Sequence, residues 1–528
     1  AREAVRTSGV QGGLIVHLGC GDGTLTAALR AGDATVVQGL EKDPAAVDKA
    51  RAHVRSLGLY GPVSIGRWDG SRLPYAENLV NLLVVDDAAR AGRDELLRVL
   101  APGGVLLERQ DDKWQRTVKP RPADIGEFTH FLGDSGNNAV AHDTRAGQPR
   151  RLQWLADPLW LRTHEIPSGV RGLVAGGGRI FYIHDEGLVG IADQRLPERW
   201  ALYCRDAFNG KLLWRRPIGP WGWTEWACAR MEDKDWTVLS GLRTIVPDEN
   251  QRRLVADGDR LYTTLGYLAP LSILDAATGE VLHTVKDTSP ARQIVAADSL
   301  VIVYSQSRAE QRDEAQPLDK KAKGKKARPV RSDADGGALR AVNAQTGQVL
   351  WHKDIPALRG LDLALCQGRI VYQAGGSLCC LDARSGKELW QVQPKVRAAR
   401  TMVAAEGAVV LHGGQTLEAR SLDDGKALWD HDARPGVGIG TCDLFIIRGA
   451  VWPGVQMVDV DRKPGKKAEN GLAIGYDLRT GKPMKEIFVG ELFSPEHHHR
   501  CYRNKATDRF MITSYEGAEY LDVQGSDH

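Results

Sequence analysis

Three glycines and two carboxylates near the start of this chain have the types and spacing that ligand chemistry requires. In the stretch IVHLGCGDGTLTAALR, Gly19, Gly21 and Gly23 directly follow an apolar run. Glycine leaves the main chain bare, so a ligand at this predicted strand-to-helix turn can approach backbone N–H groups closely. Glu41 and Asp69 follow two further apolar runs. A carboxylate there can accept hydrogen bonds from ribose hydroxyls or meet an adenine amino group. The pattern indicates a site for a cofactor that contains a nucleoside.

The spacing of the glycines separates two classes of cofactor. A dinucleotide-binding turn has the form GxGxxG, which brings the helix close to the strand. This chain reads GxGxG, and Thr24 stands at the position of the third glycine. The spacing therefore disfavours NAD.

Alternating strands and helices must position this turn. The apolar runs are continuous, as in a parallel sheet that is covered on both faces. The predicted strands are 14–18, 35–40, 63–67, 79–85 and 105–108, and the predicted helices are 25–30, 44–57 and 94–100. Pro44 stands at a helix start, where its missing N–H costs nothing. The order predicts a doubly wound α/β domain whose ligand lies at the carboxyl ends of the first strands.

Four motifs in this region occur in a recognisable order. HLGCGDG, LEKD, WDGSRLP and LLRVLAPGGVLL all fall within about the first 110 residues. With them the region resembles the class I S-adenosylmethionine-dependent methyltransferases. The resemblance implies a Rossmann-like domain over residues 1–118 with S-adenosylmethionine as its cofactor. The glycines would pass close to the methionine moiety, Glu41 would bind the ribose, and Asp69 would lie near the adenine. The implied cofactor-binding residues are His17, Gly19, Cys20, Gly21, Asp22, Gly23, Glu41, Asp69 and Gly70.

The region also departs from the family pattern. The family usually has Asp or Glu two residues before the first glycine, where this chain has His17, so weaker anchoring of the methionine amino group is expected. The fourth strand ends in VVDDA without Asn-Pro-Pro-Tyr, which gives no support for methylation of an adenine or glutamine amino group. Little chain remains after Glu108 for closing strands and a lid. A degenerate fold with ordinary loop carboxylates is therefore the competing interpretation, and no catalytic residue is predicted.

Six segments in the rest of the chain share one form. They are DAFNGKLLW (206–214), DAATGEVLH (275–283), NAQTGQVLW (343–351), DARSGKELW (382–390), SLDDGKALW (421–429) and DLRTGKPMK (477–485). Asp or Asn can cap a turn with its own side chain, and Gly supplies the positive φ of a hairpin. A period of about 40 residues with strands and turns is typical of propeller blades. We expect seven or eight blades, with eight favoured, and a last blade that is incomplete unless amino-terminal residues complete it.

The repeat resembles the PQQ-like, quinoprotein-type propellers, a family that includes redox dehydrogenases and non-catalytic envelope propellers. Four segments end in Trp214, Trp351, Trp390 and Trp429, which are expected to bring apolar rings to the blade edges. The resemblance implies a multidomain chain in which a linker at 119–130 leads into an all-β propeller at 131–528. A charged insertion is expected at about 306–335.

The propeller region offers little of the chemistry of a quinone site. Cys379 and Cys380 are adjacent, as in the vicinal disulfide of quinoprotein dehydrogenases. They lie in a predicted strand, however, where successive side chains point to opposite faces. No set of Asp, Glu and Asn for calcium is recognisable. We therefore expect two buried, reduced cysteines and no PQQ.

Three further stretches have ligand-binding residue types. HHHRC at 497–501 contains metal ligands, but adjacent residues of an extended segment point in opposite directions, so surface histidines are favoured and no metal site is predicted. The four tryptophans of WGWTEWACARMEDKDW (221–236) could stack on a sugar or peptide, with packing over a blade face favoured. The basic run at 320–331 predicts a solvated loop.

Charge and hydropathy limit the partners. The 528 residues include 70 Lys and Arg and 67 Asp and Glu, for a net charge of +3, so no specific nucleic-acid partner is predicted. No run of about 18 apolar residues predicts a transmembrane helix. The chain begins at Ala1 rather than Met, which fits a removed signal peptide, a trimmed start or a partial reading frame.

Two functions of different class fit these observations. The favoured one is an envelope-type propeller that binds a protein or polysaccharide on its face and carries a methyltransferase-like domain with retained S-adenosylmethionine binding. The alternative is an active methyltransferase whose propeller holds a substrate or partner. A PQQ-dependent oxidoreductase fits less well. S-adenosylmethionine is made in the cytoplasm, whereas such a propeller most resembles envelope proteins, so a periplasmic or envelope location is favoured over a cytoplasmic one. The methyl acceptor and the oligomeric state are not predicted.

Overall fold

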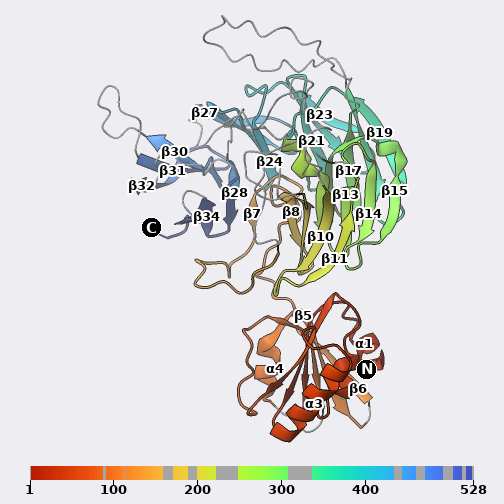
Figure 1. Ribbon diagram of the computed structural model, residues 1–528. Helices are drawn as coiled ribbons and strands as arrows, with labels where there is room; N and C mark the ends of the chain where they lie inside the picture. Colours follow the sequence, from red (N-terminus) through yellow and green to blue (C-terminus); the bar gives the residue numbers. More distant parts are fainter. Residues whose placement is uncertain are drawn as a thin grey trace, which may run out of the picture.

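A computed structural model describes the chain as an α/β domain followed by a β-rich region (Figure 1). The described residues are 2–86, 91–111, 113–157, 170–187, 199–219, 221, 248–306, 336–432, 443–458, 470–490, 503–513 and 519–525. In Figure 1 the α/β domain, coloured red to orange, lies below the β-rich region. None of the helices in these ranges is long and apolar enough to cross a membrane.

The α/β domain is built on a six-stranded sheet with the order β3-β2-β1-β4-β5-β6. Its strands are β1 (Gly13–Leu18), β2 (Thr35–Glu41), β3 (Val63–Arg67), β4 (Val80–Val85), β5 (Leu100–Gln110) and β6 (Lys113–Val118), and its helices are α1 (Arg2–Ser8), α2 (Thr24–Ala28), α3 (Pro44–Ser56) and α4 (Arg93–Val99). The first five strands pair in parallel, and β6 is antiparallel to β5. The predicted strands and helices are present, and α1 and β6 are additions that the apolar pattern does not predict.

Burial on both faces of the sheet explains the continuous apolar runs. Ile15 and Leu82 belong to one core of buried side chains, whereas Val16 and Leu83 belong to a second core. Side chains of neighbouring strand residues point to opposite faces. The central strands β1 and β4 are therefore apolar at most positions, and their carboxyl ends are where polar ligand-binding residues can appear.

Seven smaller sheets follow within the part of the chain that the structure describes. Consecutive sheets consist of β8–β11, β12–β15, β16–β19, β20–β23, β24–β27, β28–β32, and β33–β35 with β7. The strands are β7 (Val140–Ala141), β8 (Val170–Gly176), β9 (Arg179–Asp185), β10 (Trp200–Asp206), β11 (Leu212–Pro217), β12 (Leu254–Asp257), β13 (Arg260–Thr264), β14 (Leu271–Asp275), β15 (Val281–Val285), β16 (Ala291–Ala297), β17 (Leu300–Ser305), β18 (Gly337–Asn343), β19 (Val349–Ile355), β20 (Leu363–Cys366), β21 (Arg369–Ala374), β22 (Ser377–Asp382), β23 (Glu388–Val392), β24 (Thr401–Ala405), β25 (Ala408–His412), β26 (Thr416–Ser421), β27 (Ala427–Asp432), β28 (Phe445–Ile447), β29 (Ala450–Trp452), β30 (Val455–Val458), β31 (Asn470–Asp477), β32 (Pro483–Gly490), β33 (Lys505–Thr507), β34 (Phe510–Thr513) and β35 (Glu519–Asp522). The four-stranded sheets fit a propeller, and the total of seven or eight blades stays a prediction.

The six repeated segments form the turns between the last two strands of six of these sheets. Their glycines have φ between +69° and +73°, which L side chains adopt with strain. The first residue of each segment caps the turn. Asp275 Oδ1, for example, accepts the N–H groups of Ala277 and Thr278 at 3.0 and 2.8 Å. The predicted turn chemistry is confirmed.

An aromatic ring from the preceding sheet covers most of these turn glycines. A side-chain carbon built at Gly279, Gly386 or Gly425 would lie 2.7 Å from an indole ring of the neighbouring sheet. For Gly425 the ring is that of Trp390, whose Nε1 donates to the carbonyl of Leu422 at 3.1 Å. The repeat tryptophans therefore join neighbouring sheets edge to edge.

Residues 126–143, called here the crossing segment, contact the first strand of every one of these seven sheets. The carbonyls or side chains of six of its residues bond to strand residues, namely Phe128 to Ala175, Thr129 to Ala256, His130 to Ala296, Ser135 to Leu365, Gly136 to Ala404 and Asn138 to Ile446. The carbonyl of Ala139 accepts from Ala506 at 2.8 Å in the last sheet. Within the propeller region, one short segment thus ties all the described sheets together.

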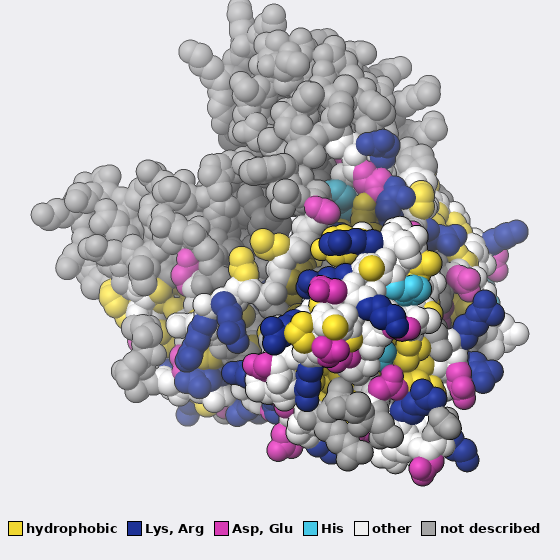
Figure 2. Space-filling view, turned by 60° about the horizontal axis from the view of Figure 1, so that its bottom comes forward, with side chains coloured by type: hydrophobic (Ala, Val, Ile, Leu, Met, Phe, Trp, Pro, Cys, Tyr) yellow, Lys and Arg dark blue, Asp and Glu magenta, His cyan; other side chains and the backbone are white. Residues whose placement is uncertain are grey.

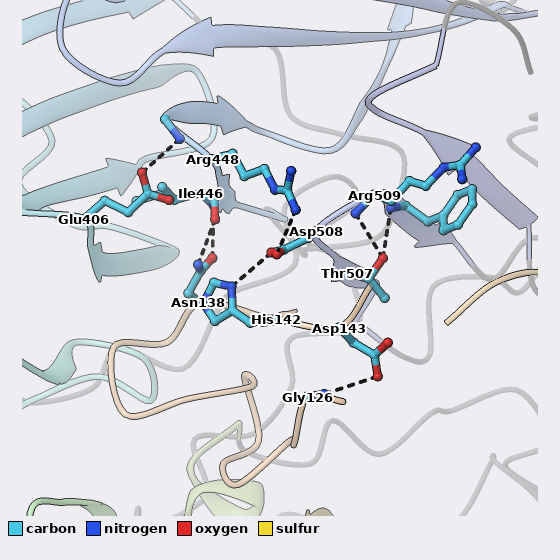
Figure 3. Close-up of polar contacts among 12 residues, drawn as sticks. Gly126, Asn138, His142, Asp143, Glu406, Ile446, Arg448, Thr507, Asp508 and Arg509 are labelled. Carbon is cyan, nitrogen blue, oxygen red and sulfur yellow. Dashed lines mark hydrogen bonds and ion pairs between the residues drawn. The ribbon is translucent and has the colours of Figure 1, made fainter. Parts of the chain in front are cut away.

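The crossing segment also completes the last sheet. Its β7 pairs in parallel with β33, which pairs on its other side with β34, and β34 pairs in turn with β35. Figure 3 shows this end of the segment, where His142 Nδ1 lies 3.0 Å from Asp508 Oδ1. Among the described residues, this sheet therefore contains three strands from the last part of the chain and a fourth strand from the crossing segment.

Candidate functional site

The turn after β1 lies at the carboxyl end of the sheet, where the sequence predicts a ligand. Gly19, Gly21 and Gly23 have φ of +73°, +52° and +81°. The N–H of Gly19 donates to the carbonyl of Leu40 at 2.9 Å, which fastens the turn to β2. A side-chain carbon built at Gly21 would meet nothing within 4 Å. The main chain at Gly21 is therefore open to a ligand.

Glu41 lies against this turn and is held by backbone donors. Its Oε2 accepts the N–H of Gly21 at 2.9 Å, and its Oε1 accepts the N–H of Lys42 at 2.7 Å. A carboxylate offers about four acceptor positions, so both oxygens keep capacity for further hydrogen bonds. The structure thus brings Glu41 and the glycine turn together, as the sequence predicts, and fixes the orientation of the carboxylate.

The other residues of the turn face different ways. Cys20 is buried, and a side-chain carbon built at Gly39 would lie 2.9 Å from its Sγ. Burial raises the pKa of this thiol to about 12, so it stays neutral and offers a ligand only its main chain. Asp22 is exposed, and its Oδ1 accepts the N–H of Thr24 at 3.0 Å. A side-chain carbon at Gly23 would lie 3.0 Å from Ala50 of α3, so glycine at this position allows the turn to pack closely on the helix.

Asp69 and Gly70 form a second short turn after β3. The Oδ1 of Asp69 accepts the N–H and the hydroxyl of Ser71 at 2.8 and 2.6 Å, and these bonds lower the pKa of Asp69. A side-chain carbon built at Gly70 would lie 2.6 Å from Lys42 Cε. The Nζ of Lys42 lies 5.1 Å from the centre of the Trp68 ring. Lys42 therefore covers the face of this turn that lies beside Glu41.

His17 does not face an open site. It is 1% exposed, its Nδ1 lies 2.8 Å from Thr26 Oγ1, and its Nε2 lies 3.3 Å from Asp86 Oδ2. The hydrogen bond from His17 lowers the pKa of Asp86. Both ring nitrogens are thus engaged within the protein, and the ring orients the carboxylate of Asp86.

Asp86 is a site residue that the sequence analysis leaves without a role. It directly follows β4 and lies beside the glycine turn, since its N–H donates to the carbonyl of Leu18 at 3.3 Å. Its Oδ1 is buried and has no hydrogen-bond partner among the residues that the structure describes, and Arg109 Nη1 forms an ion pair with it at 3.9 Å. The motif VVDDA contains this residue, and its place at the end of the strand beside β1 is the signal that could have identified it.

A separate cleft of about 960 Å³ lies between the two regions of the chain. On the α/β side its walls are Leu14, Val36 and Leu79, at the amino ends of the strands. On the other side, Glu186 accepts hydrogen bonds from Tyr203 Oη and from the Arg215 guanidinium, and Arg215 lowers the pKa of Glu186. The charges of Glu186 and Arg215 therefore neutralise each other on this wall of the cleft.

The adjacent cysteines of the propeller region are free and buried. Cys379 packs into the core shared by the sheets β16–β19 and β20–β23, and Cys380 into the core shared by β20–β23 and β24–β27. Their side chains point to opposite faces of β22, as expected. Trp221 is buried 6.3 Å from Tyr267. The segment 497–501, the basic run 320–331 and the remaining tryptophans of 221–236 lie outside the described residues.

Two protein-family models match separate parts of the chain, each less than half of its length. Residues 15–104 match the model described as a methyltransferase domain, and residues 335–491 match the model described as outer membrane protein assembly factor BamB. No curated protein sequence matches the chain significantly. The chain thus contains a methyltransferase-like domain and a BamB-like, PQQ-like propeller region.

Solved structures similar to the chain divide in the same way. A putative S-adenosylmethionine-dependent methyltransferase from Methanococcus maripaludis is 19% identical, covers 20% of this chain and 52% of its own, and has a TM-score of 0.19. The chain therefore spans about half the length of that protein. BamB from Moraxella catarrhalis is 13% identical over 68% of this chain and 85% of its own, with a TM-score of 0.34. A europium-containing methanol dehydrogenase is 11% identical, covers 74% of this chain and 81% of its own, and has a TM-score of 0.43.

Proposed function

We propose that the methyltransferase-like domain binds S-adenosylmethionine or its demethylated product at the turn Gly19–Gly23. The observation that carries this proposal is a buried carboxylate oxygen, Asp86 Oδ1, which lies beside an open glycine turn and has Arg109 at 3.9 Å but no hydrogen-bond partner in the described part of the chain. Leaving such a buried oxygen without a hydrogen bond costs about 1–3 kcal/mol, and more for a charged group. The ammonium of a methionine moiety supplies the missing donor.

The proposal gives the surrounding residues separate roles. Glu41, held by the N–H groups of Gly21 and Lys42, uses its remaining acceptor positions for the two ribose hydroxyls. The backbone at Gly19 and Gly21 accommodates the methionine moiety, and Asp86 takes the place of the acidic residue that His17 replaces. Asp69 and Gly70 lie on the adenine side, where Lys42 must swing away from Trp68 to admit a ring. Cys20 and Asp22 contribute main-chain atoms.

For the whole chain we propose a binding or scaffold role in the cell envelope, with the propeller as the part that recognises a protein or polysaccharide. The BamB family match over residues 335–491 supports an envelope propeller. On the face seen in Figure 2, Lys and Arg side chains are interspersed with Asp and Glu, which gives no support to a nucleic-acid partner. A location in the cytoplasm is the alternative that an active methyltransferase would require.

Calorimetric titration with three ligands, and with NAD for comparison, tests the site. S-adenosylmethionine, S-adenosylhomocysteine and adenosine are titrated into the wild type, Glu41→Ala and Asp86→Asn. Charge-assisted hydrogen bonds contribute about 1.5–3 kcal/mol, so Glu41→Ala weakens all three ligands by roughly ten- to a hundredfold. Asp86→Asn weakens only the two ligands that carry an amino-acid moiety. NAD binds far less well than S-adenosylmethionine.

The exposed carboxylate Asp33, at the opposite end of the sheet, provides the matched control. Asp33→Asn leaves all affinities unchanged. The proposal fails if the wild type gives no heat with millimolar S-adenosylmethionine, or if Asp86→Asn weakens adenosine as much as S-adenosylmethionine. Transfer of a methyl group to an offered acceptor would replace the scaffold role by the enzymatic one.

A further inference from the structure

One turn of the propeller region contacts the α/β domain directly. Asn209 Nδ2, in the turn between β10 and β11, donates to the carbonyl of Leu79 at 2.9 Å and to Asn81 Oδ1 at 2.7 Å. In return, Asn81 Nδ2 donates to Asp206 Oδ2 at 2.6 Å. Both asparagines lie at least half-buried. The contact is therefore a partly buried network of three hydrogen bonds, with donors on both domains.

The α/β domain is shaped to receive this turn. Asn81 Oδ1 also accepts the N–H of Leu14 at 2.8 Å, at the start of β1. Gly13 lies so close to this amide that a side-chain carbon there would collide with Asn81 Oδ1. A side-chain carbon at Gly12 would lie 2.8 Å from Cδ2 of Leu213, which follows the turn. The sequence Gly12-Gly13 thus makes room for both the polar and the apolar part of the contact.

The corresponding turns of the other sheets do something different with the same position. Where the first turn has Asn209, the others have Thr278, Thr346, Ser385, Asp424 and Thr480. The hydroxyls of Thr278, Ser385 and Thr480 bond back to the first residue of their own turn at 3.0, 2.6 and 2.7 Å. Asn209 instead reaches outward, and Asp206 keeps its second oxygen for Asn81. One turn of the six is thus specialised for contact with another domain.

We propose that the turn Asp206–Gly210 is a docking element that fixes the α/β domain to the propeller, with the glycine turn of that domain facing away from it. The contact is made with the amino ends of β1 and β4, whereas Gly19–Gly23 and Glu41 lie at the carboxyl ends. A six-residue strand is about 20 Å long, which separates the docking contact from the glycine turn. The two regions form one body with two independent binding faces, and this inference does not depend on cofactor binding.

Fixed domains are not the general expectation. Domains in one chain usually move relative to each other unless their interface is large and apolar. Here Lys119 still bonds to the α/β domain through the carbonyl of Leu100 at 2.7 Å, and Arg121 and Glu127 form an ion pair at 2.6 Å. The connection between the regions is therefore short and held at both ends, which lowers the entropy cost of a small docking contact.

The test replaces Asn209, in the full chain, by the threonine that most of the corresponding turns have at this position. Asn209→Thr introduces a side chain that the corresponding turns contain. The melting temperature of the propeller should therefore stay unchanged. We expect a larger radius of gyration in small-angle X-ray scattering, faster tryptic cleavage after Lys119 and Arg121, and a separate melting transition of the α/β domain. Thr480→Asn, which installs asparagine in a turn without this neighbour, leaves all three measurements at wild-type values.

A second variant tests the apolar part of the same contact. Leu213→Asp should give the same three changes, and because Leu213 also packs against the propeller core, the melting temperature of the propeller is recorded beside them. Wild-type scattering and cleavage for both Asn209→Thr and Leu213→Asp would overturn the proposal. The same changes in Thr480→Asn would also overturn it, because they would show that the turns respond to any substitution.

Discussion

Glycines with positive φ occur in turns of both regions, but their surroundings differ. In the propeller region, Gly386 and Gly425 lie under indole rings, and a side-chain carbon on either would approach the ring to 2.7 Å. In the α/β domain, Gly21 has equally left-handed backbone, yet a side-chain carbon there would meet nothing within 4 Å. Close packing therefore explains why these propeller positions require glycine, whereas it does not explain the glycine at position 21.

The difference separates two uses of the same residue. A glycine beneath an aromatic ring serves close packing of two sheets, and its loss must weaken the fold. A glycine that faces open space at the end of a parallel strand serves the approach of something outside the domain. The same comparison within one turn distinguishes Gly23, which packs on Ala50, from Gly21, two residues earlier. Space around a glycine thus distinguishes a structural turn from a binding turn.

Gly425→Ala should have the largest effect on stability. The substitution forces alanine into φ of +70° and drives its side chain into the ring of Trp390. Left-handed strain costs about 1–3 kcal/mol and overpacking about 1–3 kcal/mol. We expect the free energy of unfolding of the propeller to fall by roughly 2–5 kcal/mol, measured by urea denaturation with tryptophan fluorescence. A loss below about 1 kcal/mol would mean that the ring moves aside freely.

Trp390→Ala should have the next largest effect and should interact with the first substitution. Trp390 is half-buried, so its removal costs less than the about 3–5 kcal/mol of a fully buried aromatic, and it also loses the bond to Leu422. In the double variant with Gly425→Ala the steric clash is gone. The loss of unfolding free energy in the double variant should therefore be clearly smaller than the sum of the losses in the two single variants. Full additivity in the double-mutant cycle would refute the direct contact.

Much of both regions can be predicted from sequence because their signals are local. Continuous apolar runs specify buried parallel strands, and the turn from Asp275 to Gly279 specifies a hairpin within five residues. The crossing segment at 126–143 has no repeat pattern, since each of its residues bonds to a different distant strand. Asn81 and Asn209 become partners only through contact between domains. Domain boundaries at residues 118 and 130 stay predictions.

The candidate site follows the same division. Glu41 could be predicted because a carboxylate at the end of the second strand has a local pattern. Asp86 could not be assigned a role because its importance lies in the pairing of β4 with β1 and in its contact with His17, which the chain separates widely. In the sequence, His17 stands where the resembled family has an acidic residue that binds the cofactor. In the structure it orients the carboxylate of Asp86 instead. The role of a residue that depends on pairing between strands far apart in the sequence can be recognised only when the fold is known.

Gly21→Ala should have the smallest effect on stability and the sharpest one on binding. Its side chain enters open space, so only the left-handed backbone costs free energy, about 1–2 kcal/mol. The same side chain occupies the room in which we place the methionine moiety, and the affinity for S-adenosylmethionine should fall by about tenfold or more.

Gly58→Ala is the matched control, because Gly58 has φ of +67° and nothing within 4 Å but lies after α3, away from the glycine turn. Both variants should lose similar stability, and only Gly21→Ala should lose affinity in a calorimetric titration. If both bind S-adenosylmethionine like the wild type, the space above Gly21 holds no ligand. The contrast between covered and open glycines would then describe packing alone.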